Sequence, residues 1–296
     1  MRISVSAVIF SCAILLLNSC SKENSNNQPA PPGVTGNNLF GLPIESPACK
    51  PLKQFTKSNF GNDTILYQYN TDGSIANINE TTIDYTEYFK YDASGRLTEI
   101  SNSDDEEKWS FNYSGTDKKV TTFYHIMENS SDTFNVTYPA SSSVVILYND
   151  PVSDTLFRDS IVLNENYNPV SFSRIKQNKT NGNSVLLMKL SYTYSGTTLN
   201  PLSVPELSIY QWISNLYSDF NYFTAYLHTR FTYYYPATIP FGKYMQQNVA
   251  VQVDGAGTAS GIPFTDFMTN ANSYPTFFIY DKSNEPVEIT FEYSCP

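Results

Sequence analysis

The strongest constraint on the fold is a repeat of short aromatic segments, each of which ends in turn-forming residues. Residues 67–75 read Tyr-Gln-Tyr-Asn-Thr-Asp-Gly-Ser-Ile, and residues 89–97 read Phe-Lys-Tyr-Asp-Ala-Ser-Gly-Arg-Leu. A looser copy follows, so that Tyr69, Tyr91 and Tyr113 are separated by 91 − 69 = 22 and 113 − 91 = 22 residues. Asn or Asp followed by Gly tolerates the positive φ of a hairpin turn, and aromatic neighbours suit a half-buried, pleated surface. This spacing fits two strands and two turns, so the repeat predicts tandem β-hairpins.

Alternation of apolar and polar residues predicts how these strands are arranged. Trp109, Phe111 and Tyr113 alternate with polar residues, and the same pattern recurs at 190–195 and 289–293. Such alternation is typical of an antiparallel sheet with one buried face, whereas parallel α/β strands read as continuous apolar runs. Decayed copies of the repeat unit occur at 136–138, 161–170, 192–196 and 279–287. The sequence therefore predicts a mainly β fold, an antiparallel meander of tandem β-hairpins that forms a curved or barrel-like sheet.

One stretch of the expected single β domain at 48–296 departs from the repeat, and we expect it to form a helical or irregular insertion at 203–275 that packs on the sheet. Pro205 suits a first helical turn, and the residues after it lack Gly and Pro as far as Leu227. Apolar residues recur there at steps of three and four, which favours an amphipathic helix. Further on, a flexible loop is expected around three glycines, Gly255, Gly257 and Gly261.

The insertion also holds the densest group of aromatic residues, between 217 and 235. Aromatic rings with a polar end form good platforms for sugars or peptides, because they bury area and keep a hydrogen-bonding group. The candidate ligand platform consists of four tyrosines, Tyr222, Tyr226, Tyr233 and Tyr234. The alternative is that most of these rings simply pack against the sheet.

The beginning of the chain has the pattern of an export signal. Arg2 precedes an apolar run over 3–17, which has the length of a secretory h-region and is too short to span a membrane. Residues 17–20, Leu-Asn-Ser-Cys, resemble a bacterial lipobox. The resemblance implies that residues 1–19 are removed as a lipoprotein signal peptide and that Cys20 receives the lipid. A chance Leu-x-Ser-Cys in a soluble secreted protein is the alternative.

Residues 20–47 are rich in Ser, Asn, Gln, Pro and Gly and predict a flexible, lipidated tether. The chain has 18 Lys and Arg against 28 Asp and Glu, a net charge of −10, and no basic cluster. Nucleic acid is therefore not an expected partner, because contacts that neutralise phosphates are missing. The expected membrane partner is reached through the lipid on Cys20, which places the protein in the cell envelope, with the outer membrane favoured.

The four cysteines fit an exported protein. Cys12 leaves with the signal and Cys20 is lipidated, so Cys49 and Cys295 remain as the one pair that a disulfide can join. Such a bond closes a loop of 295 − 49 = 246 residues. Two free thiols are the alternative.

Residues 91–97, Tyr-Asp-Ala-Ser-Gly-Arg-Leu, resemble the core of a YD repeat, the unit of the large Rhs and teneurin β-shells. The lipobox, the polar tether and a few such units in a chain of this length are more similar to a family of Bacteroidota lipoproteins with YD-repeat-like hairpins. The resemblance covers about 60–195 and 275–295. It implies an extended, curved β-meander and assigns no activity, because the repeat contains no catalytic residue.

A second resemblance concerns modification. Three Asp-Ser/Thr-aliphatic triplets resemble the acceptor sequence of general protein O-glycosylation in Bacteroidota, with Thr64, Thr155 and Ser160 as the acceptors. Glycans at these positions imply solvent-facing side chains. The alternative is an ordinary strand start, where Asp ends a turn.

No motif assigns a reaction, a metal or a cofactor. A Gly-x-Ser-x-Gly elbow, a phosphate loop and a His-Glu-x-x-His helix are all absent from the sequence. His125 and His228 have no Cys or acidic residue at metal-ligand spacing, so we expect structural or exposed histidines. The acidic run 104–107 lacks the ligand pattern of a calcium loop, and we expect it to form a solvated hairpin tip.

Two classes of function remain. The first is a lipid-anchored binding or scaffold module for a glycan, a lipid or a protein, and we favour it over an enzyme. The second is an envelope hydrolase of the glycosidase type, which needs only two well-placed carboxylates.

Overall fold

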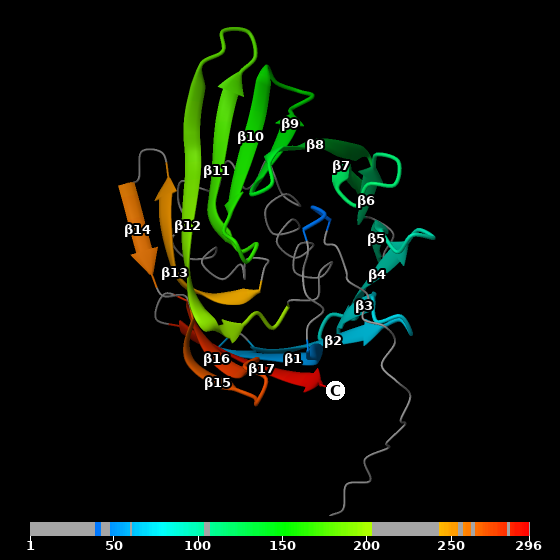
Figure 1. Cartoon of the computed structure of the whole chain (residues 1–296), viewed down its shortest axis with the longest axis vertical. Helices are drawn as coiled ribbons and strands as arrows, with labels where there is room; N and C mark the ends of the chain where they lie inside the picture. The colour runs from blue at the N-terminus through cyan, green and yellow to red at the C-terminus, as the bar shows by residue number, and fades with distance from the viewer. Residues whose placement is uncertain are drawn as a thin grey trace, which may run out of the picture. The chain divides into compact units, whose positions relative to one another are not determined.

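The protein is described here by a computed structural model that covers residues 39–42, 48–59, 61–103, 107–202, 243–253, 257–261, 264–282 and 285–295. These residues form one sheet of 17 strands and no helix (Figure 1). None of the described residues belongs to a helix that is long and apolar enough to cross a membrane. The strands are β1 (Lys50–Ser58), β2 (Gly61–Tyr69), β3 (Ile75–Glu80), β4 (Tyr85–Tyr91), β5 (Leu97–Asn102), β6 (Glu107–Tyr113), β7 (Val120–Met127), β8 (Ser130–Ala140), β9 (Ser143–Asn149), β10 (Thr155–Leu163), β11 (Pro169–Asn178), β12 (Ser184–Leu199), β13 (Tyr244–Val253), β14 (Gly257–Gly261), β15 (Phe264–Thr269), β16 (Pro275–Lys282) and β17 (Glu285–Ser294).

The sheet is an antiparallel meander, as the alternation predicted. Each strand from β1 to β14 pairs with the next one along the chain, and β15, β16 and β17 do the same. The first strand β1 also pairs with the last strand β17, with Lys50 opposite Ser294. In Figure 1 the blue β1 accordingly lies beside the red β17. The ladder therefore runs from β15 through β17 and β1 to β14, and among the described residues no register joins β14 to β15.

One face of this sheet is buried and the other faces solvent. In β10 the alternate residues Phe157, Ile161 and Leu163 are buried, as the burial pattern of the strand shows. Aromatic rings also stack between adjacent strands of the sheet. The ring centroids of Phe123 in β7 and Phe134 in β8 are 4.7 Å apart. Burial of this aromatic face supplies the main stabilising free energy of the sheet.

The insertion expected at 203–275 is smaller than predicted. Residues 244–253, 257–261 and 264–269 form β13, β14 and β15, which continue the meander. Two glycines of the expected loop, Gly257 and Gly261, are the ends of β14, which pairs with β13, and Gly255 lies outside the described residues. These strands lack the aromatic turn signature of the repeat, so the sequence pattern did not reveal them. The predicted helix lies outside the described residues.

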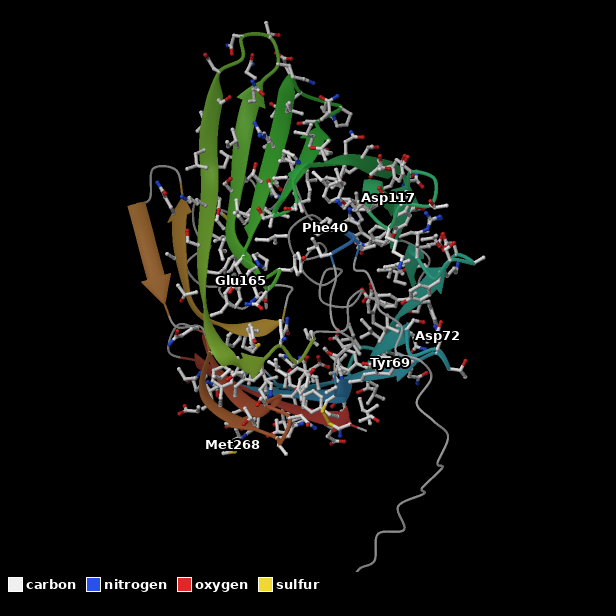
Figure 2. The ribbon with its side chains drawn as sticks, viewed as in Figure 1. Phe40, Tyr69, Asp72, Asp117, Glu165 and Met268 are labelled. Carbon is white, nitrogen blue, oxygen red and sulfur yellow. A yellow bond between two sulfur atoms is a disulfide. The ribbon has the colours of Figure 1, made fainter. Side chains whose placement is uncertain are left out.

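The tether expected at 20–47 is also shorter than predicted, because part of it is packed into the core. Phe40 is fully buried, and Leu39 and Leu42 lie in the same hydrophobic cluster (Figure 2). Phe40 forms a β-bridge with Lys119, and the Val120 amide donates to the Leu39 carbonyl over 2.8 Å. Three apolar residues are enough to anchor a polar segment, because their burial offsets the ordering cost of a few residues.

The predicted disulfide is present, since Cys49 and Cys295 are bonded. Cys49 precedes β1 and Cys295 follows β17, so the bond lies beside the pairing of these two strands. The bond therefore fixes the register of the first strand against the last.

Candidate functional site

The two ends of the strands carry different chemistry, and this difference locates the candidate site. One end, which we call the tyrosine end, contains the turns of the sequence repeat at 70–74, 92–96 and 164–168, and a further turn at 270–274 that the repeat did not predict. In each turn the first residue donates its amide to the carbonyl of the fifth and accepts a backbone amide from the fourth: Asn70 with Ser74 and Gly73, Asp92 with Arg96 and Gly95, Asn164 with Asn168 and Tyr167, and Asn270 with Tyr274 and Ser273. The fourth residue has positive φ in all four turns, at Gly73, Gly95, Tyr167 and Ser273. The same turn therefore recurs four times, with Asn or Asp at its first position and with Gly at its fourth position in only two of the four.

The repeat tyrosines reinforce the same end. Each hydroxyl donates to a backbone carbonyl at the start of the preceding strand: Tyr69 to Pro51, Tyr91 to Ile75, Tyr113 to Leu97, Tyr138 to Val120, Tyr194 to Pro169 and Tyr293 to Pro275. Their rings are half-buried against the core. Burial raises the pKa of Tyr69 and Tyr138 far above the ordinary value for a phenol, so these hydroxyls stay protonated donors. At this end the six tyrosine hydroxyls are therefore all bound to backbone carbonyls.

The opposite end of the strands holds a set of polar side chains on the buried face. We call this set the polar row, and it consists of Asn102, Glu107, His125, Asp132 and Tyr148. Asn102 is the last residue of β5 and Glu107 is the first residue of β6. Their neighbours Ser101 and Lys108 pair with each other. Because successive residues of a strand point to opposite faces, Asn102 and Glu107 lie on the face opposite to that pair. In the next two strands His125 pairs directly with Asp132. Antiparallel pairing alone thus brings these residues together.

His125 is the centre of the row. Its side chain is 1% exposed, and its Nε2 lies 2.5 Å from Oε1 of Glu107. Its ring stacks on Trp109, with 4.4 Å between centroids and 16° between planes. The short contact to an ionisable carboxylate is that of a charge-assisted hydrogen bond in which Nε2–H donates. Glu107 and Trp109 together fix the position and tilt of the imidazole.

The second carboxylate of the row, Asp132, is held from the other side. The Tyr148 hydroxyl donates to Oδ1 of Asp132 over 2.8 Å. Burial, followed by the hydrogen bond and charge of Asp132, raises the pKa of Tyr148 well above its ordinary value. Tyr148 is therefore a permanent donor that orients Asp132 beside His125.

Two atoms in the polar row are buried without a hydrogen-bond partner. They are Oδ1 of Asn102, in a residue 8% exposed, and Nδ1 of His125. A buried polar atom without a partner costs about 1–3 kcal/mol, so such atoms are rare in folded proteins. The row is therefore built with free hydrogen-bonding capacity at its centre.

The buried face holds a second polar group, an ion pair between an arginine and an aspartate. Arg174 and Asp159 face each other on β11 and β10, and two guanidinium nitrogens donate to the carboxylate over 2.8 and 2.6 Å. Both residues are buried. A bidentate pair of this kind neutralises both charges, and we assign it a structural role.

The residues predicted from the sequence fall in several places. Cys20, His228 and the four tyrosines of the proposed platform, Tyr222, Tyr226, Tyr233 and Tyr234, lie outside the described residues, as do residues 104–106 of the acidic run. Glu107 begins a strand and contacts His125, so the run's last residue belongs to the site and not to a solvated tip.

The glycosylation triplets meet a different outcome at each acceptor. Thr155 is 7% exposed, so the prediction of a solvent-facing side chain is wrong there. Thr155 begins β10 on the buried face, in the alternate row that continues with Phe157. Thr64 and Ser160 are half-buried, and modification at these two residues stays a prediction.

His125 was expected to be structural or exposed, and the structure makes it buried. Its acidic neighbours are separated from it by 18 residues in one case and 7 in the other, through strand pairing. No local spacing rule covers such contacts. One signal was available: His125 occupies the apolar phase of an alternating strand, a position where a polar side chain needs partners.

Among the described residues, no group of three or more His, Cys, Asp or Glu side chains is placed to hold a metal ion. What the row can do chemically is accept hydrogen bonds from a ligand that carries donors. The residues that carry its two carboxylates, one amide oxygen and the unpartnered imidazole nitrogen lie at the same end of four neighbouring strands, β5 to β8.

The fold resembles that of known proteins, although the sequence does not. No family model and no curated protein matches the chain. A solved structure described as a porin-like protein from Bacteroides vulgatus matches with a TM-score of 0.53 and 10% identity, over 83% of this chain and 98% of that chain. A porin-like protein from Bacteroides uniformis matches with a TM-score of 0.49 and 11% identity, over 85% and 99%. The likeness establishes the fold alone.

Proposed function

We propose that this chain is a lipid-anchored protein of the cell envelope that binds a glycan, a lipid or a protein through the polar row. The observation that carries the proposal is the pair of buried, unpartnered atoms, Oδ1 of Asn102 and Nδ1 of His125, beside two oriented carboxylates. A fold keeps such atoms against their cost when a ligand satisfies them.

The exposed face of the sheet supports a position in water at the end of a tether. It carries ion pairs between neighbouring strands, such as Lys57 with Glu288 and Lys90 with Glu99. Polar and charged side chains of this kind suit an aqueous surface. The lipobox-like sequence that ends at Cys20 supports attachment by lipid, and the fold it shares with the porin-like protein from a Bacteroides species agrees with an envelope location.

Lipid attachment is tested by metabolic labelling with palmitate. The label should enter the wild-type chain and be lost in Cys20→Ser. Incorporation that survives this change would refute the assignment of Cys20.

Binding is tested by capture from a native envelope extract, alongside a glycan array. The wild-type protein should retain a ligand that Asn102→Leu does not, because the substitution removes the free acceptor without adding charge. Equal capture by both proteins would overturn the role of the polar row in binding.

One observation favours the alternative of an envelope hydrolase. Glu107, His125 and Asp132 place an imidazole between two carboxylates, which is a composition suited to general acid–base chemistry. Turnover of a chromogenic glycoside or ester panel that disappears in both Glu107→Gln and Asp132→Asn would favour the hydrolase over the binding module.

A further inference from the structure

We infer that the polar row recognises a primary ammonium group on its ligand, an inference that rests on the binding function proposed above. The free groups of the row are all acceptors when Nε2–H of His125 donates to Glu107. They are Oδ1 of Asn102 and, in that tautomer, Nδ1 of His125. A ligand must therefore bring hydrogen-bond donors, and the two carboxylates favour donors that carry positive charge.

The surroundings of the row reinforce this preference for a cation. The turns at this end of the strands are acidic, and the described part of this rim between β2 and β10 includes Asp63, Glu80, Asp84, Glu87, Glu128, Asp150 and Asp154. Glu87 pairs directly with Asn102. Negative potential of this kind raises the local concentration of cations and repels anions.

The geometry distinguishes an ammonium from a guanidinium. A guanidinium binds best when one carboxylate offers both oxygens to its planar fork. Here Oε1 of Glu107 is engaged by His125 and Oδ1 of Asp132 by Tyr148. Neither carboxylate therefore offers both oxygens to a guanidinium, whereas an ammonium group can be bound through a single free oxygen.

The row is also reachable from the rim. Asn102 is the last residue of β5 and Glu107 the first residue of β6. The Glu107 side chain is 35% exposed although its partner His125 is buried. A ligand group can therefore approach along the end of these strands and reach the Glu107 carboxylate, which contacts His125.

The test uses two probe pairs that differ in the ammonium group and separate the two sources of such a group. Glucosamine and glucose represent a sugar, and glycerophosphoethanolamine and glycerophosphoglycerol represent a lipid headgroup. Binding is followed by titration calorimetry and by the imidazole nitrogen shifts of His125, in a His228→Gln background that leaves one histidine.

The charged member of at least one pair should bind saturably and shift Nδ1 of His125, whereas its neutral partner should not. Whichever pair responds identifies the source. Glu107→Gln and Asp132→Asn should each weaken this binding about ten-fold or more, as expected when one charge-assisted hydrogen bond is lost. Melting temperatures of the variants show whether they still fold.

Glu99→Gln is the matched control, because Glu99 lies on β5 near Asn102 and pairs with Lys90 and Lys108 on the exposed face. It should leave probe binding unchanged. The inference is overturned if no charged probe binds, if a neutral probe binds equally well, or if Glu99→Gln weakens binding as much as the row variants. The proposed binding function is tested separately. If the wild type captures a ligand from the envelope and Asn102→Leu does not, the binding function is supported even where the preference for an ammonium group is overturned.

Discussion

The two ends of the strands differ in how they use their polar groups. We compare the tyrosine end with the opposite end, which holds the polar row and which we call the polar end. At the tyrosine end, Oδ1 of Asn164 accepts two backbone amides, from Asn166 and Asn168, each over 3.0 Å. At the polar end, Oδ1 of Asn102 accepts none. Both are Asn residues of one meander, so the difference does not follow from residue type. The turn at 164–168 uses its asparagine oxygen to hold the backbone, whereas the corresponding oxygen of Asn102 has no partner.

Cation–aromatic contacts sharpen the same contrast. At the tyrosine end, Lys50 lies over Tyr69, Arg96 over Tyr113 and Lys119 over Tyr138, at 5.2, 4.8 and 4.9 Å from the ring centroids. Each cation precedes the residue whose carbonyl accepts the tyrosine hydroxyl. At the tyrosine end, cations of the repeat therefore lie over its tyrosine rings. In the polar row, the carboxylates instead contact a histidine and a tyrosine.

The largest effect expected from breaking the tyrosine end comes from the disulfide. The double variant Cys49→Ser, Cys295→Ser should lose roughly 4 kcal/mol of unfolding free energy, because the unfolded chain regains a long loop. Denaturant unfolding measures the loss, and reduction of the wild type should reproduce it. A change below about 1 kcal/mol in both experiments would show that β1 and β17 hold together without the bond.

Next in size is the loss of one repeat tyrosine. Tyr91→Ala should cost roughly 3 kcal/mol, because it removes a half-buried ring and leaves the Ile75 carbonyl without its donor. Tyr91→Phe is the matched control and should cost only about 1 kcal/mol, since it keeps the ring. If Tyr91→Ala leaves the melting temperature unchanged, the tyrosine end does not have the structural role assigned to it.

A direct comparison applies one substitution to both ends. Asn164→Leu should cost about 1–2 kcal/mol, because two turn amides lose their acceptor. Asn102→Leu should cost less than about 0.5 kcal/mol or stabilise the fold, because it removes a buried atom that has no partner. Chemical denaturation of the two variants side by side measures the difference. Equal losses would mean that the two ends are not specialised.

The smallest effects concern pH, where the two ends should respond with opposite sign. At the tyrosine end, hydrogen bonds from the Ser74 hydroxyl and amide lower the pKa of Asp72 below its ordinary 3.8. Its contribution is therefore complete above pH 3.8 and is lost as the pH falls through the lowered value. At the polar end, burial and then the neighbouring Asp63 raise the pKa of Glu80 above its ordinary 4.5. Ionised Glu80 thus opposes folding, and this cost appears as the pH rises through the raised value.

Two neutral variants test these signs. At pH 7, Asp72→Asn should slightly lower the melting temperature and Glu80→Gln should slightly raise it. Each variant should approach the wild type once the pH falls below the pKa of the corresponding carboxyl, because that group is then largely protonated. Shifts of the same sign at pH 7 would contradict the contrast.

The sequence alone determined most of the fold through local chemistry. The turn at 92–96 could be predicted because Asp92 and Gly95 act within five residues, where side-chain capping and positive φ are local properties. Period-two alternation likewise predicted which face of β6 is buried, and the cysteine count predicted the bond between Cys49 and Cys295.

Tertiary structure decided the features that depend on which strands are neighbours. The polar row joins five residues from five strands, β5 to β9, and a shift of one residue in any register would turn the affected members to the other face. The packing of Phe40 against the strand that begins at Val120 is equally non-local. Local sequence specifies turns and faces because those energies act within a few residues, whereas the site arises from register, which the summed pairing and packing of the whole sheet selects.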